Sequence, residues 1–206
     1  MRVLLLPCLA VCSLALSGCS VAYSVHPLNT KEDAVEEPAL QGVWTTGKDD
    51  DGDLCIQKSD GHAYSMIMFD PASKLTEIYE INLVRLNDRL FADIVFDQQA
   101  VDRTKFETPL GTLTNHVIVK LDIAEDDITY FPLDSRAIRN LSQEGYPPLG
   151  FLEVNEGILL TTSTDDLRLY LSLYPDRVFT DSEHYKRKIN EETGMPVTSC
   201  SLPTLP

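Results

Sequence analysis

The sequence predicts a mainly β fold, an antiparallel meander or β-barrel with two or three short helices in its C-terminal half. Runs in which apolar and polar residues alternate recur from residue 42 onward. Turn signals separate these runs, among them Ser59-Asp60-Gly61 and Asn87-Asp88. Stretches with helical spacing come only after residue 130, so we expect the helices to interrupt the strands late in the chain.

The predicted strands are short and closely spaced. In 89–96 the even-numbered residues are apolar and share one face, and in 117–123 the odd-numbered residues do the same. On a closed sheet, faces this apolar turn inward. The strand-like runs are 42–46, 54–58, 62–69, 75–86, 89–96, 117–123, 128–131, 151–154 and 158–162. Roughly seven to nine antiparallel strands in one domain are typical of a meander or barrel.

Two helices are marked by capping residues, and a third is predicted from composition. Asp134 or Ser135 caps the first helix, which runs to about residue 144. Ser163 caps the second, and Pro175 ends it. Apolar and aromatic residues at helical spacing indicate that the second helix packs against the sheet: Leu167, Tyr170, Leu171 and Tyr174. The third, polar helix is predicted over 182–192.

The N-terminus has the three parts of a secretory signal peptide. Met1-Arg2 gives a basic start, residues 3–16 form an apolar run without charge, and the small residues Ser17 and Gly18 follow. This apolar run is shorter than the roughly 20 residues that a membrane-spanning helix needs. We therefore expect residues 1–18 to be a signal peptide.

The end of this segment, Leu16-Ser17-Gly18-Cys19, resembles the lipobox of bacterial lipoproteins. The resemblance implies that the Cys19 thiol takes a diacylglyceryl group, that the chain is cut before Cys19, and that the new amine is acylated, for example with palmitate. Two or three acyl chains hold a protein stably at a membrane. Ser20 in place of Asp resembles the pattern for the outer membrane of Gram-negative bacteria, facing the periplasm. The alternative is an ordinary secretory signal that is cut elsewhere and contains an incidental cysteine.

The mature chain is expected to divide into a tether and one domain. Residues 19–39 carry the lipid and then form a flexible tether, because they contain Pro27, Pro38 and an acidic cluster but few large apolar residues. Residues 40–206 are enough for a single β-barrel-like domain with its own core, followed by a C-terminal helix and tail.

The net charge excludes one class of partner. The formal charge is −15, and loss of Arg2 with the signal peptide takes it to −16. Such an acidic surface repels nucleic acid, so we expect no nucleic-acid partner. The expected partners are the membrane, through the lipid anchor, and either a small apolar ligand or another envelope protein.

The cysteines predict one disulfide. Cys8 and Cys12 leave with the signal peptide and Cys19 is lipidated, so Cys55 and Cys200 remain. In an exported protein such a pair indicates a bridge, which stabilises by about 2–4 kcal/mol when it closes a long loop. The alternative is two thiols that never meet. Neither spacing fits a metal site.

Gly42-Val43-Trp44, at the start of the first strand, resembles the G-x-W motif of lipocalins and other calycins. The resemblance implies a barrel in which the glycine admits a close approach and Trp44 plugs one end. We expect an apolar lumen that includes Trp44 and lies near Met66, Met68 and Ile94. In a barrel of this size, side chains either fill the lumen or leave room for one small ligand.

The layout of the chain resembles a lipocalin/calycin-like group of uncharacterised bacterial lipoproteins. The likeness rests on the lipobox, His26-Pro27-Leu28, Leu40-Gln41-Gly42-Val43-Trp44, the strands, and Leu159-Leu160-Thr161-Thr162-Ser163-Thr164 before an amphipathic helix. It supports the fold more than any activity.

No catalytic or metal-binding motif is present in the sequence. The acidic run 49–53 fails as an EF-hand calcium loop, because Gly47 and Lys58 fall where ligands belong. The histidines are far apart and show no ligand spacing: His26, His62, His116 and His184. We expect neither a metal nor a cofactor.

Two functions from different classes are consistent with these features. The one we favour is a non-enzymatic, lipid-anchored module that binds a small apolar molecule or an envelope protein. The alternative is an envelope hydrolase. An apolar cavity in the barrel would favour the first, and a cleft joining His62 or His116 to buried carboxylates would favour the second.

Overall fold

The computed structural model describes residues 21–30, 32–47, 52–70, 75–96, 115–154, 157–198 and 200. The predicted signal peptide and Cys19 lie outside these residues. In the part of the chain that is described, no helix combines the length and apolarity needed to cross a membrane.

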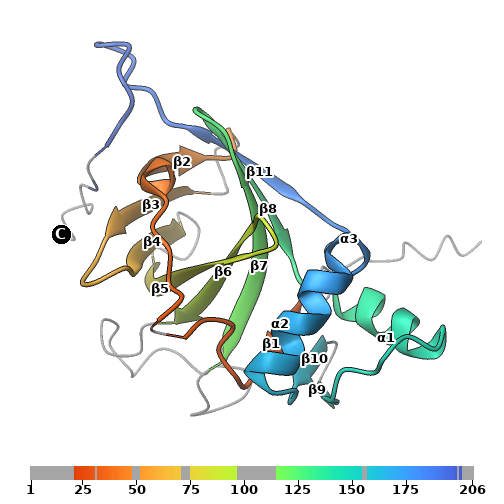
Figure 1. The fold of residues 1–206 in the computed structure, drawn as a ribbon. Helices are drawn as coiled ribbons and strands as arrows, with labels where there is room; N and C mark the ends of the chain where they lie inside the picture. Colours follow the sequence, from red (N-terminus) through yellow and green to blue (C-terminus); the bar gives the residue numbers. More distant parts are fainter. Residues whose placement is uncertain are drawn as a thin grey trace, which may run out of the picture.

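A closed antiparallel β-barrel forms the centre of the fold (Figure 1). The barrel strands are β2 (Gly42–Thr45), β3 (Asp53–Lys58), β4 (Tyr64–Asp70), β5 (Leu75–Leu86), β6 (Arg89–Phe96), β7 (His116–Ile123), β8 (Asp127–Pro132) and β11 (Glu183–Arg187). Among the described residues, these eight strands follow one another round the ring in sequence order, with β11 between β8 and β2. Pairing of β6 with β7 completes the closure. The predicted mainly β barrel is therefore confirmed.

Alternation along the strands places apolar side chains inside the barrel. Ala92 on β6 pairs with Val119 on β7, and both are buried. The face of β6 predicted to turn inward does so, and Leu90 is only 6% exposed. The hairpin between β5 and β6 is tight because Asn87 and Asp88 have φ values of 46° and 65°. Positive φ at both central residues is the geometry of a type I′ turn, whose twist matches that of the strands.

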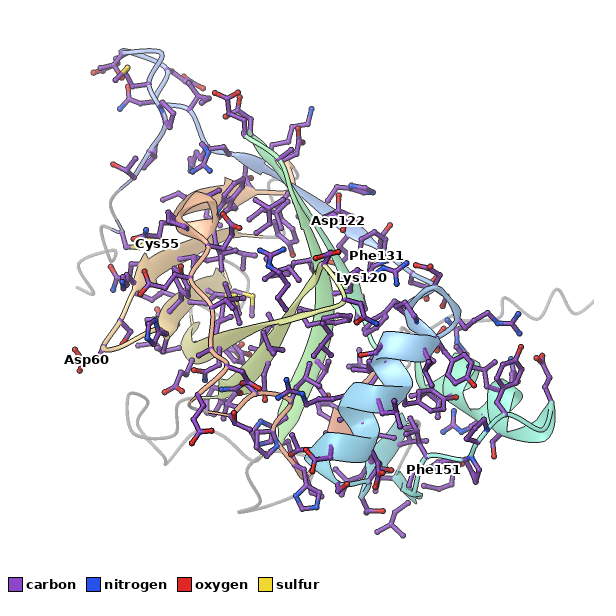
Figure 2. The ribbon with its side chains drawn as sticks, viewed as in Figure 1. Cys55, Asp60, Lys120, Asp122, Phe131 and Phe151 are labelled. Carbon is purple, nitrogen blue, oxygen red and sulfur yellow. A yellow bond between two sulfur atoms is a disulfide. The ribbon has the colours of Figure 1, made fainter. Side chains whose placement is uncertain are left out.

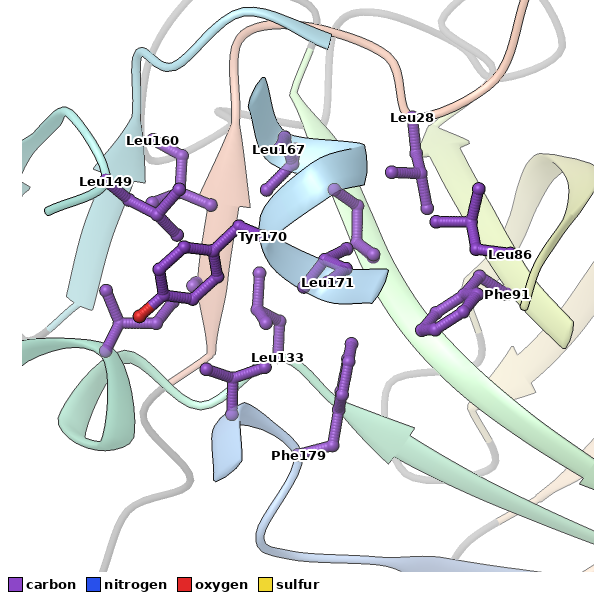
Figure 3. Packing of buried hydrophobic residues seen from close by; sticks show 14 of the residues in the cluster. Leu28, Leu86, Phe91, Leu133, Leu149, Leu160, Leu167, Tyr170, Leu171 and Phe179 are labelled. Carbon is purple, nitrogen blue, oxygen red and sulfur yellow. The ribbon is translucent and has the colours of Figure 1, made fainter. Parts of the chain in front are cut away.

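A second layer packs against one flank of the barrel (Figure 1). In the described residues it contains the strands β1 (Ala22–Ser24), β9 (Phe151–Val154) and β10 (Gly157–Leu160), and the helices α1 (Ser135–Gln143), α2 (Thr164–Leu173) and α3 (Pro175–Val178). β1 pairs antiparallel with the start of β7 and parallel with β10, so this small sheet continues from the barrel. α2 buries Leu167, Tyr170 and Leu171 in a core that also contains Leu133 and Phe179 (Figure 3). Each fully buried Leu stabilises by about 1.5–3 kcal/mol.

The helices α1 and α2 begin at the predicted caps. The Asp134 carboxylate accepts the backbone N–H of Arg136 at 2.8 Å. The Ser163 hydroxyl accepts the backbone N–H of Asp166 and donates to its carboxylate at 2.7 Å. These bonds satisfy N–H groups that have no partner within the helix.

The segment 182–192 is not the predicted polar helix. Its first half forms β11, which pairs with β8 on one side and β2 on the other. Tyr185 is its one large apolar side chain directed into the barrel, so the strand is stabilised by pairing rather than by a pattern readable in the segment itself. β9 and β10, predicted to extend the meander, lie outside the barrel, where β10 pairs with β1.

The described residues of the predicted tether, 21–30 and 32–39, pack against the rest of the fold rather than forming a free linker. Ala22–Ser24 forms β1, Leu28 is completely buried, and Pro38–Leu40 forms a 3-10 turn, η1. The Leu28 backbone N–H donates to the buried Asp93 carboxylate at 2.7 Å. The described part of this segment packs closely because it contributes β1 and Leu28 to the second layer, despite its few large apolar residues.

A disulfide joins Cys55 on β3 to Cys200, with the Cα atoms 5.7 Å apart. This is the pair that the sequence predicted. Cys55 lies on the outer face of the barrel (Figure 2), in a small apolar cluster with Val43, Ile67 and Val197. The Val43 backbone N–H donates to the Val197 carbonyl at 3.1 Å. The disulfide therefore fastens the C-terminal segment to the outside of the barrel.

Candidate ligand-binding cavity

An apolar cavity of about 270 Å³ lies inside the barrel. The residues predicted to border a lumen, Trp44, Met66, Met68 and Ile94, all border it. Most of the remaining wall consists of aliphatic side chains from the barrel strands, such as Ile81. The side chains therefore leave room inside the barrel rather than filling it.

One end of the cavity is closed by packed side chains. The Trp44 ring is completely buried there, and its indole N–H donates to the Leu40 carbonyl at 2.9 Å. Leu40 is the last residue of η1, which covers this end of the barrel. Tyr64 and Leu83 are almost completely buried in the same cluster.

Arg187 seals the same end from outside. Its guanidinium carbon lies 4.1 Å from the centre of the Trp44 ring. The guanidinium donates to the carbonyls of Gln41 at 2.8 Å and Ala39 at 2.9 Å. Gly42 permits this approach, since its φ is +139° and a Cβ atom there would lie 2.6 Å from the Arg187 Nη1 atom.

Among the described residues, the opposite end of the cavity is open and carries carboxylates. It is formed where β4, β6 and β8 end and where β5, β7 and β11 begin. Glu183, the first residue of β11, is exposed and borders the cavity. Glu77, near the start of β5, faces inward because it lies two residues before Tyr79 on the same face of the strand, and Tyr79 borders the cavity. β5 and β11 lie on opposite sides of the ring, so each of these two walls carries a carboxylate.

Tyrosine side chains connect these carboxylates to the interior. The Tyr79 hydroxyl donates to Glu77, and the Tyr185 hydroxyl donates to Glu183 at 3.2 Å. The Tyr130 and Tyr185 rings stack with their centres 5.7 Å apart.

The environment of the tyrosines raises two hydroxyl pKa values. Burial, followed by the charges of Tyr185 and Glu183 and hydrogen bonding to those side chains, raises the pKa of Tyr130 well above its usual value. Burial, followed by the hydrogen bond to Glu77 and its charge, does the same for the pKa of Tyr79. Both hydroxyls therefore keep their protons at physiological pH.

The structure joins His116 to a buried carboxylate outside the cavity. The His116 Nδ1 atom lies 2.7 Å from the Asp93 Oδ1 atom, and the Asp93 side chain is 1% exposed. The second Asp93 oxygen accepts the Leu28 backbone N–H. Neither His116 nor Asp93 borders the barrel cavity. This pair therefore holds the N-terminal segment against β6.

The side-chain contacts of His62 and His184 lie at the surface. His62 contacts Glu36 at 3.0 Å, and Lys58 pairs with the same carboxylate at 2.7 Å. His184 contacts the exposed Thr129 hydroxyl at 2.9 Å. Within the described residues, no three His, Cys, Asp or Glu side chains gather as a metal site.

No protein-family model, curated protein or solved structure matches this chain. The geometry of the cavity is therefore the basis for interpreting its function.

The sequence prediction identified the apolar wall of the cavity but not its polar rim. The sequence pattern could have placed Tyr79 and Tyr130 in the cavity wall, because each shares a face with apolar residues of its predicted strand. Glu183 and Tyr185 could not be placed in this way, because their segment was predicted to be a helix. Only the pairing of β11 with β8 brings them beside Tyr130.

Proposed function

We propose that this chain is a lipid-anchored lipoprotein of the cell envelope whose barrel binds a small apolar molecule without catalysing a reaction. The observation that carries the proposal is the cavity, which is apolar, closed at Trp44 and open at Glu183. Such a space with few polar groups is typical of a small-molecule site. The anchor is Cys19, and the location is the outer membrane, facing the periplasm, in a Gram-negative cell.

The size of the cavity limits the ligand. A cavity of about 150 Å³ lined by Leu, Ile and Phe binds benzene, so one of about 270 Å³ has room for roughly ten carbon atoms. A medium-length alkyl chain or a two-ring aromatic system fits this limit. Burial of an apolar body of this size supports micromolar affinity, about −8 kcal/mol.

The contact between His116 and Asp93 is the observation that favours a hydrolase. Both Asp93 oxygens are already engaged, one by His116 and the other by the Leu28 backbone. The pair lies on the outer face of the barrel, away from the cavity. These contacts support a structural role for the pair, so we propose the binding module in preference to the hydrolase.

The direct test is ligand capture. The purified protein is incubated with a lipid extract of the cell envelope and analysed by native mass spectrometry. We expect one apolar molecule to remain bound per chain. Ala92 borders the cavity and is 1% exposed, so Ala92→Leu should fill part of the space and reduce capture several-fold.

The matched control is Ala63→Leu, in the turn between β3 and β4 and away from the cavity. It adds the same atoms and should leave capture unchanged, with thermal unfolding confirming that both variants fold. A protein that stays empty against the extract and against a panel of alkyl and aromatic compounds would contradict the proposal. A module that binds envelope proteins would then replace it.

A further inference from the structure

The open end of the cavity has one sign of charge. In the described part of the chain, Glu183 is the charged side chain that borders the cavity, and no Lys, Arg or His borders it. Glu77 faces inward on the opposite wall of the barrel. A head group that emerges between these walls therefore meets carboxylates and no basic side chain among the described residues.

The tyrosines at this end add hydrogen-bond acceptors to the carboxylates. A tyrosine hydroxyl has one proton to donate. Tyr79 donates its proton to Glu77, and Tyr185 donates its proton to Glu183. The groups presented to a ligand head are consequently carboxylate and phenol oxygens, which accept hydrogen bonds.

Building on the proposed function, we propose that the cavity selects amphiphiles with a cationic or hydroxyl head group and excludes fatty acids. The apolar body, roughly ten carbon atoms, fills the barrel. The head lies between Glu183 and Glu77, where an ammonium group gains both hydrogen bonds and Coulomb attraction. A carboxylate head there meets like charges and, among the described residues that border the cavity, no cationic side chain.

The test compares three ligands that differ only in the head group. Trp44 is the single tryptophan and borders the cavity, so its fluorescence reports binding. The purified protein is titrated at pH 7 with decylamine, decanol and decanoate, each below its micelle concentration. We expect decylamine to bind about tenfold more tightly than decanoate, which corresponds to about 1.4 kcal/mol, with decanol between them.

Variants that remove a carboxylate test whether the open end of the cavity causes the head-group selectivity. Glu183→Gln should reduce the ratio of decylamine affinity to decanoate affinity to a few-fold. Adding Glu77→Gln should make the two affinities equal. Glu191→Gln removes the same charge from an exposed turn and should leave the ratio unchanged. Equal binding of amine and acid, or a ratio that survives both substitutions, overturns this inference and leaves the proposed function standing. If none of the three compounds binds, both fail.

A second, independent observation concerns the place where the anchor emerges. Val21 borders the cavity and forms an isolated β-bridge with Asp134. The next residues are fixed as β1. Two residue steps separate Val21 from Cys19, a reach of at most about 7 Å.

We infer that the open end of the barrel faces the membrane surface. With Cys19 lipidated, the short link to Val21 places the bilayer beside the cavity mouth. An apolar ligand would then pass between the bilayer and the cavity with little exposure to water. This inference rests on the proposed lipid anchor.

The test measures the distance of each barrel end from the bilayer. His184→Cys places a spin label near the open end, and Asp60→Cys places one in the turn at the closed end (Figure 2). The lipidated protein is inserted in vesicles that carry nickel-chelating lipid head groups, which relax nearby spin labels. We expect several-fold stronger relaxation at position 184 than at position 60. Equal or reversed relaxation overturns the orientation, and protein that fails to associate with the vesicles overturns the anchor as well.

Discussion

The Arg187 guanidinium lies over the Trp44 ring at 4.1 Å and joins the last barrel strand to the first. Arg187 also donates to the Gln41 and Ala39 carbonyls, so one side chain fixes η1, β2 and β11 together. This contact closes the barrel at the end where the cavity stops.

Arg187→Ala should lower the free energy of unfolding by about 2–4 kcal/mol, because it removes a stacked cation and hydrogen bonds to two partly buried carbonyls. Arg187→Lys should recover little of this loss, since an ammonium group lacks the planar fork that reaches two carbonyls. Urea unfolding monitored by circular dichroism measures both. The neighbouring exposed Lys186→Ala should change stability by less than about 0.5 kcal/mol. A lysine variant as stable as the native protein would show that the fork geometry is unimportant.

Trp44 should emit at short wavelength in the native state and shift to the red on unfolding, because its ring is completely buried. Trp44→Ala should cost about 3–5 kcal/mol, the usual loss for an aromatic residue removed from a core. Fluorescence spectra and denaturant titration provide the two measurements. A native spectrum that is red-shifted and readily quenched by acrylamide would contradict the closed end described here.

Cys55 and Cys200 should be recovered as one disulfide-linked peptide pair when protein purified from the envelope is mapped by mass spectrometry without reduction. Replacing both residues by Ser should lower stability by about 2–4 kcal/mol, since the bridge closes a long loop. The barrel itself should persist, because the disulfide lies on its outer face. Free thiols at both positions in the folded protein would exclude the bridge.

Cys19→Ser should abolish labelling with radioactive palmitate and leave a soluble or unprocessed product, because the thioether requires a thiol. The variant should leave the barrel folded, since residue 19 precedes the ordered strand β1. Cys55→Ser serves as the control, and it should keep both labelling and sedimentation. Continued labelling of Cys19→Ser would exclude the lipobox interpretation.

Asp134→Ala should lower stability at pH 7 by about 1–2 kcal/mol, the usual cost of losing a helix N-cap. Burial opposes ionisation of this carboxyl, but hydrogen bonds from Thr180, Arg136 and Ala137, together with the Arg136 charge, hold its pKa below the usual value. A lowered pKa in the folded state stabilises above the unfolded pKa, and that contribution is lost as the pH falls through the folded pKa.

The difference between native protein and Asp134→Ala should therefore shrink below about pH 4, near the unfolded pKa of an aspartate. Thermal unfolding of both proteins from pH 3 to pH 7 measures this difference in stability. Asp122→Ala, an exposed site on β7, is the control and should show little effect at either pH. A difference that stays constant over this range would show that the Asp134 charge contributes nothing.

Local patterns in the amino-acid sequence were enough to predict the barrel strands β2 to β8, the caps at Asp134 and Ser163, the position of Trp44 at a closed end and the apolar wall of the cavity. These features follow from local rules. Alternation with a period of two sets the inward face, and a capping residue satisfies free N–H groups one turn away. The cysteine pair could also be predicted, because the predicted processing of the N-terminus would leave only Cys55 and Cys200 free to pair.

The folded structure was needed to establish which strand closes the barrel, where residues 21–30 and 32–40 lie, and which described residues surround the cavity mouth. β11 is stabilised by strands on both sides, and the segment around Leu28 is held by burial and by the distant Asp93 carboxylate. Glu77 and Glu183 lie on opposite walls of one opening although more than a hundred residues separate them in the chain. Interactions between partners so far apart leave no local periodicity, because each depends on a surface that exists only once the barrel has closed.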